Sequence, residues 1–493
     1  MLEDGLGDSQ QATVQSVVQE FEVGSEKIQE ITNYFVKQIK HGLKDKHAYQ
    51  IPSFVTQIPS GREKGLFLAV DLGGTNCRVC AVTLHGDSTF EVFQRKHLVP
   101  HDIRVHSSHK PLFHFIALKI QDLLREHKSS GSSDSSEACF NLGFTFSFTC
   151  EQTSISSGTL VHWDKGWDIP STLGQDPCAL LQEAIDEISL PVRVRVLAND
   201  AVGTLLTRAY TSKTKNSTLA SIILGTGTNA AYIERMQNIQ RLDTTADRAQ
   251  HSNGRGIMVI NTEWGSWDDG LKVLPQTRFD KLVDESSSDP GCGLLEKMVS
   301  GMYLGELLRL SLLDLMRNAT GASSKDLRAV QMLATAIVKR SARLVGAGLA
   351  AILIQSGRLD TSGMSHKTGL GAHTHQIHDK STSTQIGSRR NTLTRFIRRM
   401  FGCIRPEEPS PISTNGSSYD SKDTLESSEL TDEVIDIAVD GSLFEFHTAF
   451  ESFMRTALHD VEAIGKSNAA RIKIELTRDG SGTGAALIAA AAA

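Results

Sequence analysis

The chain has 493 residues, of which 39% are hydrophobic and 22% are charged, and its formal net charge is −6. This composition is typical of a soluble globular protein rather than a disordered or fibrous one, and the length favours two or three structural units. The negative net charge argues against nucleic acid as the main ligand, because a duplex-binding protein normally carries a broad basic field.

The start of the chain, MLEDGLGDSQ, lacks the basic and apolar regions of a signal peptide, and no apolar run is long enough to span a bilayer. Seven cysteines without a regular framework fit a reducing compartment. We therefore expect a cytoplasmic location, with the nucleus as the alternative. Cys77 and Cys80 form a C-x-x-C, but they fall on a predicted strand whose period of two puts them on opposite faces, which disfavours a metal or redox role.

The first part of the chain predicts a helical lead-in followed by an α/β domain. Apolar residues recur near helical spacing within residues 13–40, so this segment should pack on the body of the protein. Two apolar runs around a Gly-Gly pair predict a β-hairpin at 65–84. Further strands are predicted in ACFNLGFTFSF and VRVRVLAND, with helices in LFHFIALKIQDLLREH and CALLQEAIDEI, giving an α/β domain over roughly 60–208.

The second part repeats this theme. LASIILGTGTNAAYIER predicts another strand, glycine turn and strand, and the Leu- and Ala-rich stretches 294–316 and 334–355 predict long helices. Near the end, IDIAVDGSLFEF and IKIELTRDGSGTGAALIAAAAA each predict a strand, an Asp-Gly-Ser turn and a helix. The chain is therefore predicted to hold two halves of similar construction.

A compositional break interrupts the second half at 361–433, where Ser, Thr and His dominate without apolar periodicity, which predicts a disordered insertion. Its arginines between 389 and 405 are followed by an acidic stretch from Glu407 to Glu433. This pattern suits a protein partner, an anionic lipid surface or a nuclear import receptor, or simply a solvated loop with segregated charges. Four histidines of the insertion have loose metal-ligand spacing, and we interpret them as ordinary polar residues without a metal-binding role: His366, His373, His375 and His378.

Two glycine turns could hold phosphate groups. In DLGGTN, Gly73 and Gly74 can take positive φ and leave backbone amides clear for phosphate oxygens, although a plain hairpin turn is the alternative. A second glycine turn between predicted strands lies in LGTGTN, from Leu224 to Asn229. Two such turns are typical of a protein that holds a nucleotide between duplicated halves. The Asp-Gly-Ser turns at 440–442 and 479–481 add helix starts that favour anions.

A carboxylate that could act as a base lies in LANDAVGT. Asn199 and Asp200 end a predicted strand just before a helix. Asp200 could cap that helix. Beside phosphate loops, an aspartate at a strand end can instead accept a proton from an attacking hydroxyl.

These motifs together make the sequence resemble a hexokinase, of the actin-like sugar kinase superfamily. GLFLAVDLGGTNCRV, LGFTFSF, KGWDIP, LANDAVGT, IILGTGTNAAY, NTEWGSWDD and LEKMVSGMYLGELLRL occur in the family's order. The resemblance implies a two-lobed α/β fold of the actin-like ATPase (ribonuclease H-like) type with a deep interdomain cleft. It further implies a helical lead-in at 1–58 on the large lobe, a small lobe at 59–208, a large lobe at 209–360, the insertion at 361–433, the rest of the large lobe at 434–480, and a C-terminal helix at 481–493 that returns to the small lobe.

The resemblance also implies an activity, which is phosphorylation of the 6-hydroxyl of a hexose such as glucose by ATP. Asp200 would be the general base, assisted by Lys165. The implied sugar-binding residues are Ser147, Asp164, Lys165, Asn199, Asp200, Glu263 and Glu296. The implied ATP-binding residues are Asp71, Gly73, Gly74, Thr75, Asn76, Arg78, Gly225, Gly227, Thr228, Gly441, Ser442, Gly480 and Ser481. Mg²⁺ would bind through the phosphates and through water near Asp71 and Asp200, with no direct protein ligand.

The sequence departs from the family pattern in three places. Asp164 stands where active members place a sugar-binding threonine, Thr149 replaces a proline, and the segment after Met316 is shorter than usual. The Asp164 carboxylate could pair with Lys165, could turn to solvent, or could repel Asp200 and the γ-phosphate, which at about 5 Å and a dielectric near 20 costs roughly 3 kcal/mol. The alternative function is therefore a catalytically impaired glucose- and ATP-binding regulator of carbon-responsive gene expression.

Overall fold

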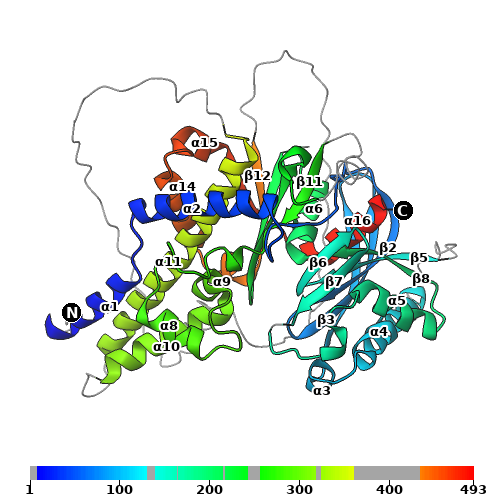
Figure 1. The fold of residues 1–493 in the computed structure, drawn as a ribbon, viewed down its shortest axis with the longest axis horizontal. Helices are drawn as coiled ribbons and strands as arrows, with labels where there is room; N and C mark the ends of the chain where they lie inside the picture. Colours follow the sequence, from blue (N-terminus) through cyan, green and yellow to red (C-terminus); the bar gives the residue numbers. More distant parts are fainter. Residues whose placement is uncertain are drawn as a thin grey trace, which may run out of the picture.

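The computed structural model describes residues 8–129, 139–163, 165–214, 217–242, 256–317, 324–359 and 434–492. Asp164, the predicted insertion 361–433 and its four histidines lie outside these described residues. The two halves of the chain form two lobes, each built around one mixed β-sheet (Figure 1). In the described part of the chain, no helix has the length and apolar character needed to cross a membrane.

The sheet of the small lobe has the strand order β4-β3-β2-β5-β8. The predicted hairpin is confirmed, because β2 (Lys64–Leu72) pairs antiparallel with β3 (Asn76–His85) from Lys64 opposite His85 to Leu72 opposite Cys77. β4 (Phe90–Leu98) continues this meander, whereas β5 (Phe140–Phe146) and β8 (Val192–Ala198) run parallel to β2.

The sheet of the large lobe repeats this arrangement. Its order β11-β10-β9-β12-β13 again joins an antiparallel meander to two parallel strands. The strands are β9 (Thr218–Leu224), β10 (Thr228–Arg235), β11 (Ile257–Asn261), β12 (Ile435–Asp440) and β13 (Ile472–Leu476). The short strand β1 (Ile51–Pro52) adds to the free edge of β11. The prediction of two similarly built halves is therefore confirmed.

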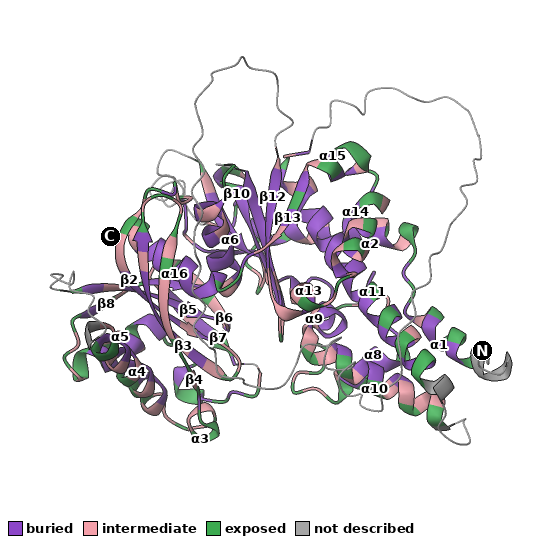
Figure 2. Cartoon of the chain, turned by 180° about the vertical axis from the view of Figure 1, so that it is seen from behind, coloured by how far each residue is buried: buried purple, intermediate pink, exposed green. Residues whose placement is uncertain are grey.

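The helix that ends each half crosses to the sheet of the other half. α6 (Asp200–Thr211) packs beside β9 and β10 of the large lobe, and α16 (Gly480–Ala491) packs on β2 and β5 of the small lobe. The two helices touch through glycine, since a Cβ at Gly484 would lie 2.0 Å from the carbonyl oxygen of Gly203. This α6–α16 contact joins the two lobes, and Figure 2 shows it largely buried.

Both faces of the small-lobe sheet are covered, which explains the nearly continuous apolar sequence of β2. Leu68 and Val70 belong to the apolar cluster beneath α4 (Lys110–Ser129), whereas Ala69 belongs to the cluster beneath α16. Cys77 and Cys80 are free thiols on opposite faces of β3, as their spacing predicts.

The N-terminal lead-in consists of two helices, α1 (Asp8–Glu20) and α2 (Ser25–Lys44). Both pack on the long helix α11 (Ser324–Ser356) of the large lobe. Ile28, Ile31 and Phe35 of α2 are fully buried, and the Phe35 ring lies 5.1 Å from the ring of Trp267. The apolar residues of α1 and α2 therefore face the core of the large lobe.

The remaining elements connect the sheets and surround the cleft. In the small lobe they are α3 (His101–Arg104), the hairpin β6 (Thr149–Ser154) and β7 (Ser157–His162), η1 (Pro170–Thr172) and α5 (Pro177–Glu187). In the large lobe they are η2 (Met236–Asn238), η3 (Trp264–Ser266), α8 (Arg278–Glu285), α9 (Leu294–Val299), α10 (Gly301–Arg317), α13 (Ser442–Phe446), α14 (Phe450–Asp460) and α15 (Gly465–Arg471).

Candidate active site

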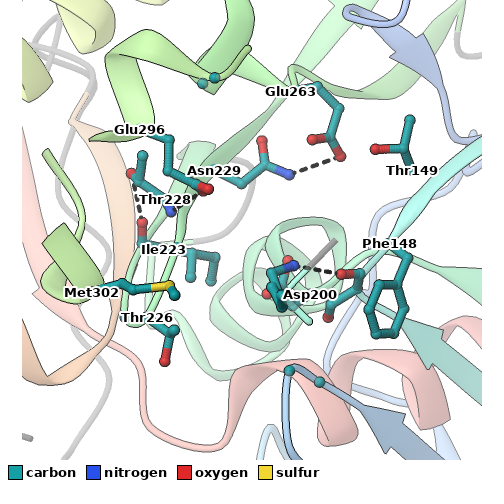
Figure 3. A pocket seen from close by; sticks show the side chains of 18 of the residues that line it. Phe148, Thr149, Asp200, Ile223, Thr226, Thr228, Asn229, Glu263, Glu296 and Met302 are labelled. Carbon is teal, nitrogen blue, oxygen red and sulfur yellow. Dashed lines mark hydrogen bonds between the residues drawn. The ribbon is translucent and has the colours of Figure 1, made fainter. Parts of the chain in front are cut away.

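A cleft of about 450 Å³ lies between the two lobes, where the glycine turns of both halves meet. Asp200, Glu263 and Glu296 come from separate elements and point into this cleft, as Figure 3 shows. The cleft is lined mainly by polar side chains and by glycine backbone, so it suits a hydrophilic ligand better than an apolar one.

Asp200 is the first residue of α6, directly after β8. The side chain that caps the helix is that of Asn199, which accepts a hydrogen bond from the Ala201 amide at 2.8 Å, so Asp200 is not the N-cap residue. Burial raises the pKa of the Asp200 carboxyl above its usual value, and Asp71 adds to this rise, while the Lys165 ammonium opposes it. A carboxylate in such a position is suited to accept a proton.

Lys165 reaches the base of the cleft from a strained loop. Its φ of 55° lies in the left-handed region, which is uncommon for a residue with a Cβ. Its Nζ donates a hydrogen bond to the carbonyl oxygen of Ser147 at 2.7 Å. Gly74 makes room for it, because a Cβ at Gly74 would lie 3.3 Å from the Lys165 Cδ. The ammonium is thereby held near Asp200.

Asn229, the last residue of the LGTGTN motif, links several of the predicted sugar-binding residues. Its Nδ2 atom donates to Asn261 Oδ1 at 2.9 Å, and to Asn199 Oδ1 and Glu263 Oε1 at 3.2 Å each. Asn261 also donates to Glu263 Oε1 at 2.8 Å. Glu263 itself has a φ of 46°, so this amide network holds its carboxylate on a strained backbone.

Glu296, one of the predicted sugar-binding residues, is hydrogen-bonded to the second glycine turn. Its Oε2 atom accepts a hydrogen bond from the Thr228 amide at 2.9 Å. A Cβ at Gly227 would lie 2.6 Å from the same oxygen, so a larger residue there would displace the Glu296 carboxylate.

The glycines of the two turns do not adopt the predicted left-handed conformation. Neither Gly73 nor Gly74 adopts positive φ, and the same holds for Gly225 and Gly227. What Gly74 and Gly227 provide is space for Lys165 and Glu296, rather than a left-handed backbone.

The carboxylates of Asp71, Asp200 and Asp440 all line the cleft, together with the glycine turns. Ser481 Oγ donates to Asp71 Oδ2 at 2.7 Å. Burial raises the pKa of Asp71, and the charge of Arg78 partly offsets this rise. Burial likewise raises the pKa of Asp440 to about 6, with the charges of Asp479 and Asp200 adding to the effect and a hydrogen bond from the Gly480 amide opposing it. The site therefore concentrates negative charge that is costly without a compensating cation.

Most of the residues expected from the resemblance line the cleft: Asp71, Gly73, Gly74, Ser147, Lys165, Asn199, Asp200, Gly225, Gly227, Thr228, Glu263, Glu296, Gly441 and Ser481. The lining does not include Thr75, Asn76, Arg78, Ser442 or Gly480.

Two of the residues outside the lining have identifiable roles elsewhere. The Nη1 atom of Arg78 lies 2.8 Å from Asp479 Oδ1, in an ion pair that ties β3 to the turn before α16. Gly480 packs α16 against α6, since a Cβ there would lie 2.6 Å from Thr204 Oγ1. Asp164 lies outside the described residues, so its side chain is not placed.

Sequence reasoning missed several residues that line the cleft, among them two with polar side chains described above, and one residue beside it. Asn229 and Asp440 line the cleft, and Asn261 supports Glu263. All three lie inside motifs that the sequence already singles out, LGTGTN, VDGS and NTEWG. A polar side chain within a glycine-turn motif is therefore the signal that could have identified them.

Comparison with known proteins agrees with this geometry. Two family models, both described as Hexokinase, match residues 13–210 and residues 219–323, 316–389 and 412–491. The chain belongs to the hexokinase family. Of the predicted insertion, residues 390–411 are matched by neither model.

Relatives match almost the full length of the chain. A glucokinase of Aspergillus niger is 37% identical over 486 residues, covering 96% of this chain and 95% of that protein. Glucokinase-1 of Saccharomyces cerevisiae is 33% identical over 98% of each chain. The solved structure of a Schistosoma mansoni hexokinase complexed with glucose has a TM-score of 0.70 at 28% identity and covers 98% of this chain. The two-lobed actin-like kinase fold is thus confirmed, whereas the comparisons give no specific support to the regulatory alternative.

Proposed function

We propose that this hexokinase-family chain transfers the γ-phosphoryl group of ATP to the 6-hydroxyl of a hexose such as glucose, with Asp200 as the general base. The family membership and the near full-length match to two glucokinases support the reaction class. The observation that carries the assignment of the base is the buried carboxylate of Asp200 at the start of α6, in a cleft that also holds Lys165, Glu263 and Glu296.

The sugar would occupy the part of the cleft bounded by Asn199, Lys165, Glu263 and Glu296. Carboxylates and amides accept and donate hydrogen bonds to hydroxyl groups, and a site of this kind rejects analogues that lack a hydroxyl, because its buried polar groups are then left unpaired. The 6-hydroxyl would donate its proton to Asp200 as it attacks phosphorus. The ammonium of Lys165 stabilises the carboxylate in its ionised form, which is the form that accepts this proton.

The nucleotide would lie along the two glycine turns, with adenosine bordered by Gly441, Ser442 and the start of α16. Gly73, Gly74, Gly225 and Gly227 present backbone without side chains to this part of the cleft. Phosphoryl transfer depends above all on positioning and on neutralisation of phosphate charge. The link from Glu296 to the Thr228 amide would make the phosphate turn sensitive to the occupancy of the sugar site.

Mg²⁺ fits the acidic residues at the convergence of the turns. Asp71, Asp200 and Asp440 supply hard oxygen donors, and burial raises the pKa of each carboxyl. Mg²⁺ typically binds one or two carboxylates, water and substrate phosphates together. When bound, it would neutralise charge on the phosphate oxygens. Asp71 and Asp440 would hold the hydrated ion, and this proposal adds Asp440 to the sequence expectation.

A coupled assay of the purified full chain with MgATP and a panel of hexoses tests this function. We expect turnover with glucose that is abolished in Asp200→Ala. The Asp164→Thr variant provides a second arm, because it restores the threonine of active relatives. Absence of turnover in both the natural chain and Asp164→Thr, together with saturable glucose binding by isothermal titration, would contradict the proposal.

Other features of the sequence remain proposals. They are the lobe boundaries at residues 58, 208, 360, 433 and 480, a protein partner for residues 361–433, and the cytoplasmic location with the nucleus as alternative. Gel filtration with candidate partners, with and without residues 390–411, tests the role of the segment that lies outside the family match.

A further inference from the structure

A compact group of potential metal ligands lies outside the cleft, at the C-terminal end of α2. One ligand atom each from His41, Asp45 and His47 lies within 4.8 Å of the other two. His41 lies in the last turn of α2 and Asp45 is the C-cap residue of that helix, and their side chains approach to 3.7 Å. Two imidazoles and a carboxylate are a ligand set that zinc uses in proteins.

The hydrogen bonds around His41 leave one ring nitrogen available. The hydroxyl of Tyr49 donates its single proton to Gln38 Oε1 at 2.9 Å. Its oxygen can therefore only accept from His41 Nδ1, which lies 3.2 Å away. In the neutral imidazole the lone pair is then on Nε2, and this atom lies 3.7 Å from Asp45 Oδ2. Two electron-pair donors thus face each other, and a cation between them satisfies both.

His47 is held beside this pair by its ring and its backbone. Its ring centroid lies 4.2 Å from that of His41, and it stacks on Tyr49 at 4.9 Å with an interplanar angle of 10°. Its carbonyl oxygen accepts a hydrogen bond from Arg241 Nη2 at 3.1 Å. Its Nε2 atom is shielded from solvent and has no hydrogen-bond partner among the residues that the structure describes. An unsatisfied buried nitrogen of this kind calls for an explanation.

The charges around the cluster are compatible with a bound cation. Lys44 and Lys46 flank Asp45 in the sequence, and the charge of Arg241 acts on His47. The Nη atoms of Arg241 donate to the carbonyl oxygens of Gly42, His47, Tyr49 and Gln50. These carbonyls partly offset its charge. The C-terminal end of α2 contributes the negative end of the helix dipole, and Asp45 contributes a full negative charge.

We propose that His41, Asp45 and His47 form a zinc site that is separate from the sugar cleft. Ligand atoms around a tetrahedral zinc ion lie about 3.4 Å apart, so small side-chain rotations would close the present arrangement, with water as the fourth ligand. The Tyr49 hydroxyl orients His41 from outside the ligand set.

Zinc bound there would fasten the end of α2 to the segment that leads into β1. That segment joins both lobes, because β1 pairs with β11 of the large lobe and the carbonyl oxygen of Ser53 accepts from Gln152 Nε2 of β6 at 3.0 Å. The site therefore stiffens a connection between the lobes, and zinc raises the midpoint of thermal unfolding.

Titration of the metal-free full chain with zinc chloride by calorimetry tests the proposal. The chain used carries His366→Asn, His373→Asn, His375→Asn and His378→Asn, which removes the histidine-rich tract of the insertion. The other histidine-rich tract, from His97 to His114, stays the same in the parent chain and in every variant, so it does not contribute to the difference between them. We expect one zinc ion per chain, and loss of affinity of about 100-fold in His41→Ala or His47→Ala. Cobalt at the same site should give the visible absorption bands of a tetrahedral ion, with an accompanying rise in the unfolding midpoint.

The control is His459→Ala, because His459 is likewise an exposed residue in the last turn of a helix, α14, and its replacement should leave zinc binding unchanged. Circular dichroism checks the fold of each variant, and the half-exposed Asp45→Asn offers a substitution that leaves both stacked rings in place. Zinc affinity that is the same in His41→Ala, His47→Ala and Asp45→Asn as in the parent chain would overturn the proposal, as would a parent chain that binds no zinc.

Discussion

The indole Nε1 of Trp167 donates a hydrogen bond to the carbonyl oxygen of Gly74 at 2.6 Å. This bond joins the loop that carries Lys165 to the first glycine turn. The buried side chain of Trp167 therefore fixes the position of the proposed sugar-binding loop relative to the proposed phosphate turn. Trp167 also stacks on Trp163, with ring centroids 5.3 Å apart, and both indoles are buried in the small lobe beside the loop that carries Lys165.

Replacing Trp167 with phenylalanine should remove the hydrogen bond between the two loops while keeping most of the apolar packing. Loss of one buried hydrogen bond costs about 1 kcal/mol, which corresponds to roughly a fivefold fall in kcat/KM. Trp163→Phe is the matched control, because the indole of Trp163 donates to Ile169 and Thr172 instead of the phosphate turn. Steady-state kinetics with ATP as the varied substrate should separate the two variants. Equal effects on kcat/KM for ATP would contradict a role of the Trp167 bond in positioning the turn.

Asp440 should make the stability of the protein depend on pH. Its folded-state pKa of about 6 exceeds the ordinary value of 3.8, so the folded protein binds the proton more tightly than the unfolded chain. The resulting stability is present below pH 3.8 and is lost as the pH rises through 6. Asp440→Asn should therefore gain up to about 3 kcal/mol relative to the natural chain between pH 4 and pH 7.5.

Thermal unfolding of both proteins at several pH values, without ligands, measures this difference. The exposed Asp186→Asn serves as the control and should change stability by less than about 0.5 kcal/mol at every pH. A difference between Asp440→Asn and the natural chain that stays constant with pH would show that the Asp440 carboxyl is not perturbed. The same variant should also require more Mg²⁺ for half-maximal activity.

The close contact between Gly203 of α6 and Gly484 of α16 should be essential for the packing of these two helices, which connects the lobes. Alanine at 484 would place a Cβ 2.0 Å from the backbone oxygen of Gly203, and backbone cannot move aside cheaply. We expect Gly484→Ala to lose at least about 3 kcal/mol of stability. Gly305→Ala in α10 is the matched control, because no atom lies within 4 Å of its new Cβ. That change should stabilise the protein by about 0.5–1 kcal/mol. Equal unfolding midpoints for the two variants would contradict this account of the joint.

Local patterns in the sequence were enough to predict the main elements of the fold. Alternating apolar runs around glycine predicted the β2–β3 and β9–β10 hairpins, because strand periodicity and turn chemistry are local properties. The function of individual glycines was not predictable in this way. Gly74 and Gly227 leave space for the side chains of Lys165 and Glu296, which are distant in the sequence and approach only in the folded protein.

The network around Asn229 shows the same limit at the candidate site. The motif itself was recognised, but the bonds of its asparagine to Asn199, Asn261 and Glu263 depend on how β8, β10 and β11 come together. The pKa of Asp440 likewise follows from burial and from two neighbouring carboxylates, neither of which is fixed by its local sequence. Resemblance to a family supplied residue roles that composition and spacing alone could not.

Single-turnover kinetics of the natural chain and of Asp200→Asn, with enzyme in excess over glucose and with MgATP, test the central claim most directly. We predict that the natural chain forms glucose 6-phosphate and that Asp200→Asn slows this step by at least about 100-fold. Calorimetry should show glucose affinity in the variant within about fivefold of the natural value, since the substitution removes one hydrogen-bond acceptor at most. Equal rates of product formation in the two proteins would contradict the assignment of Asp200 as the general base.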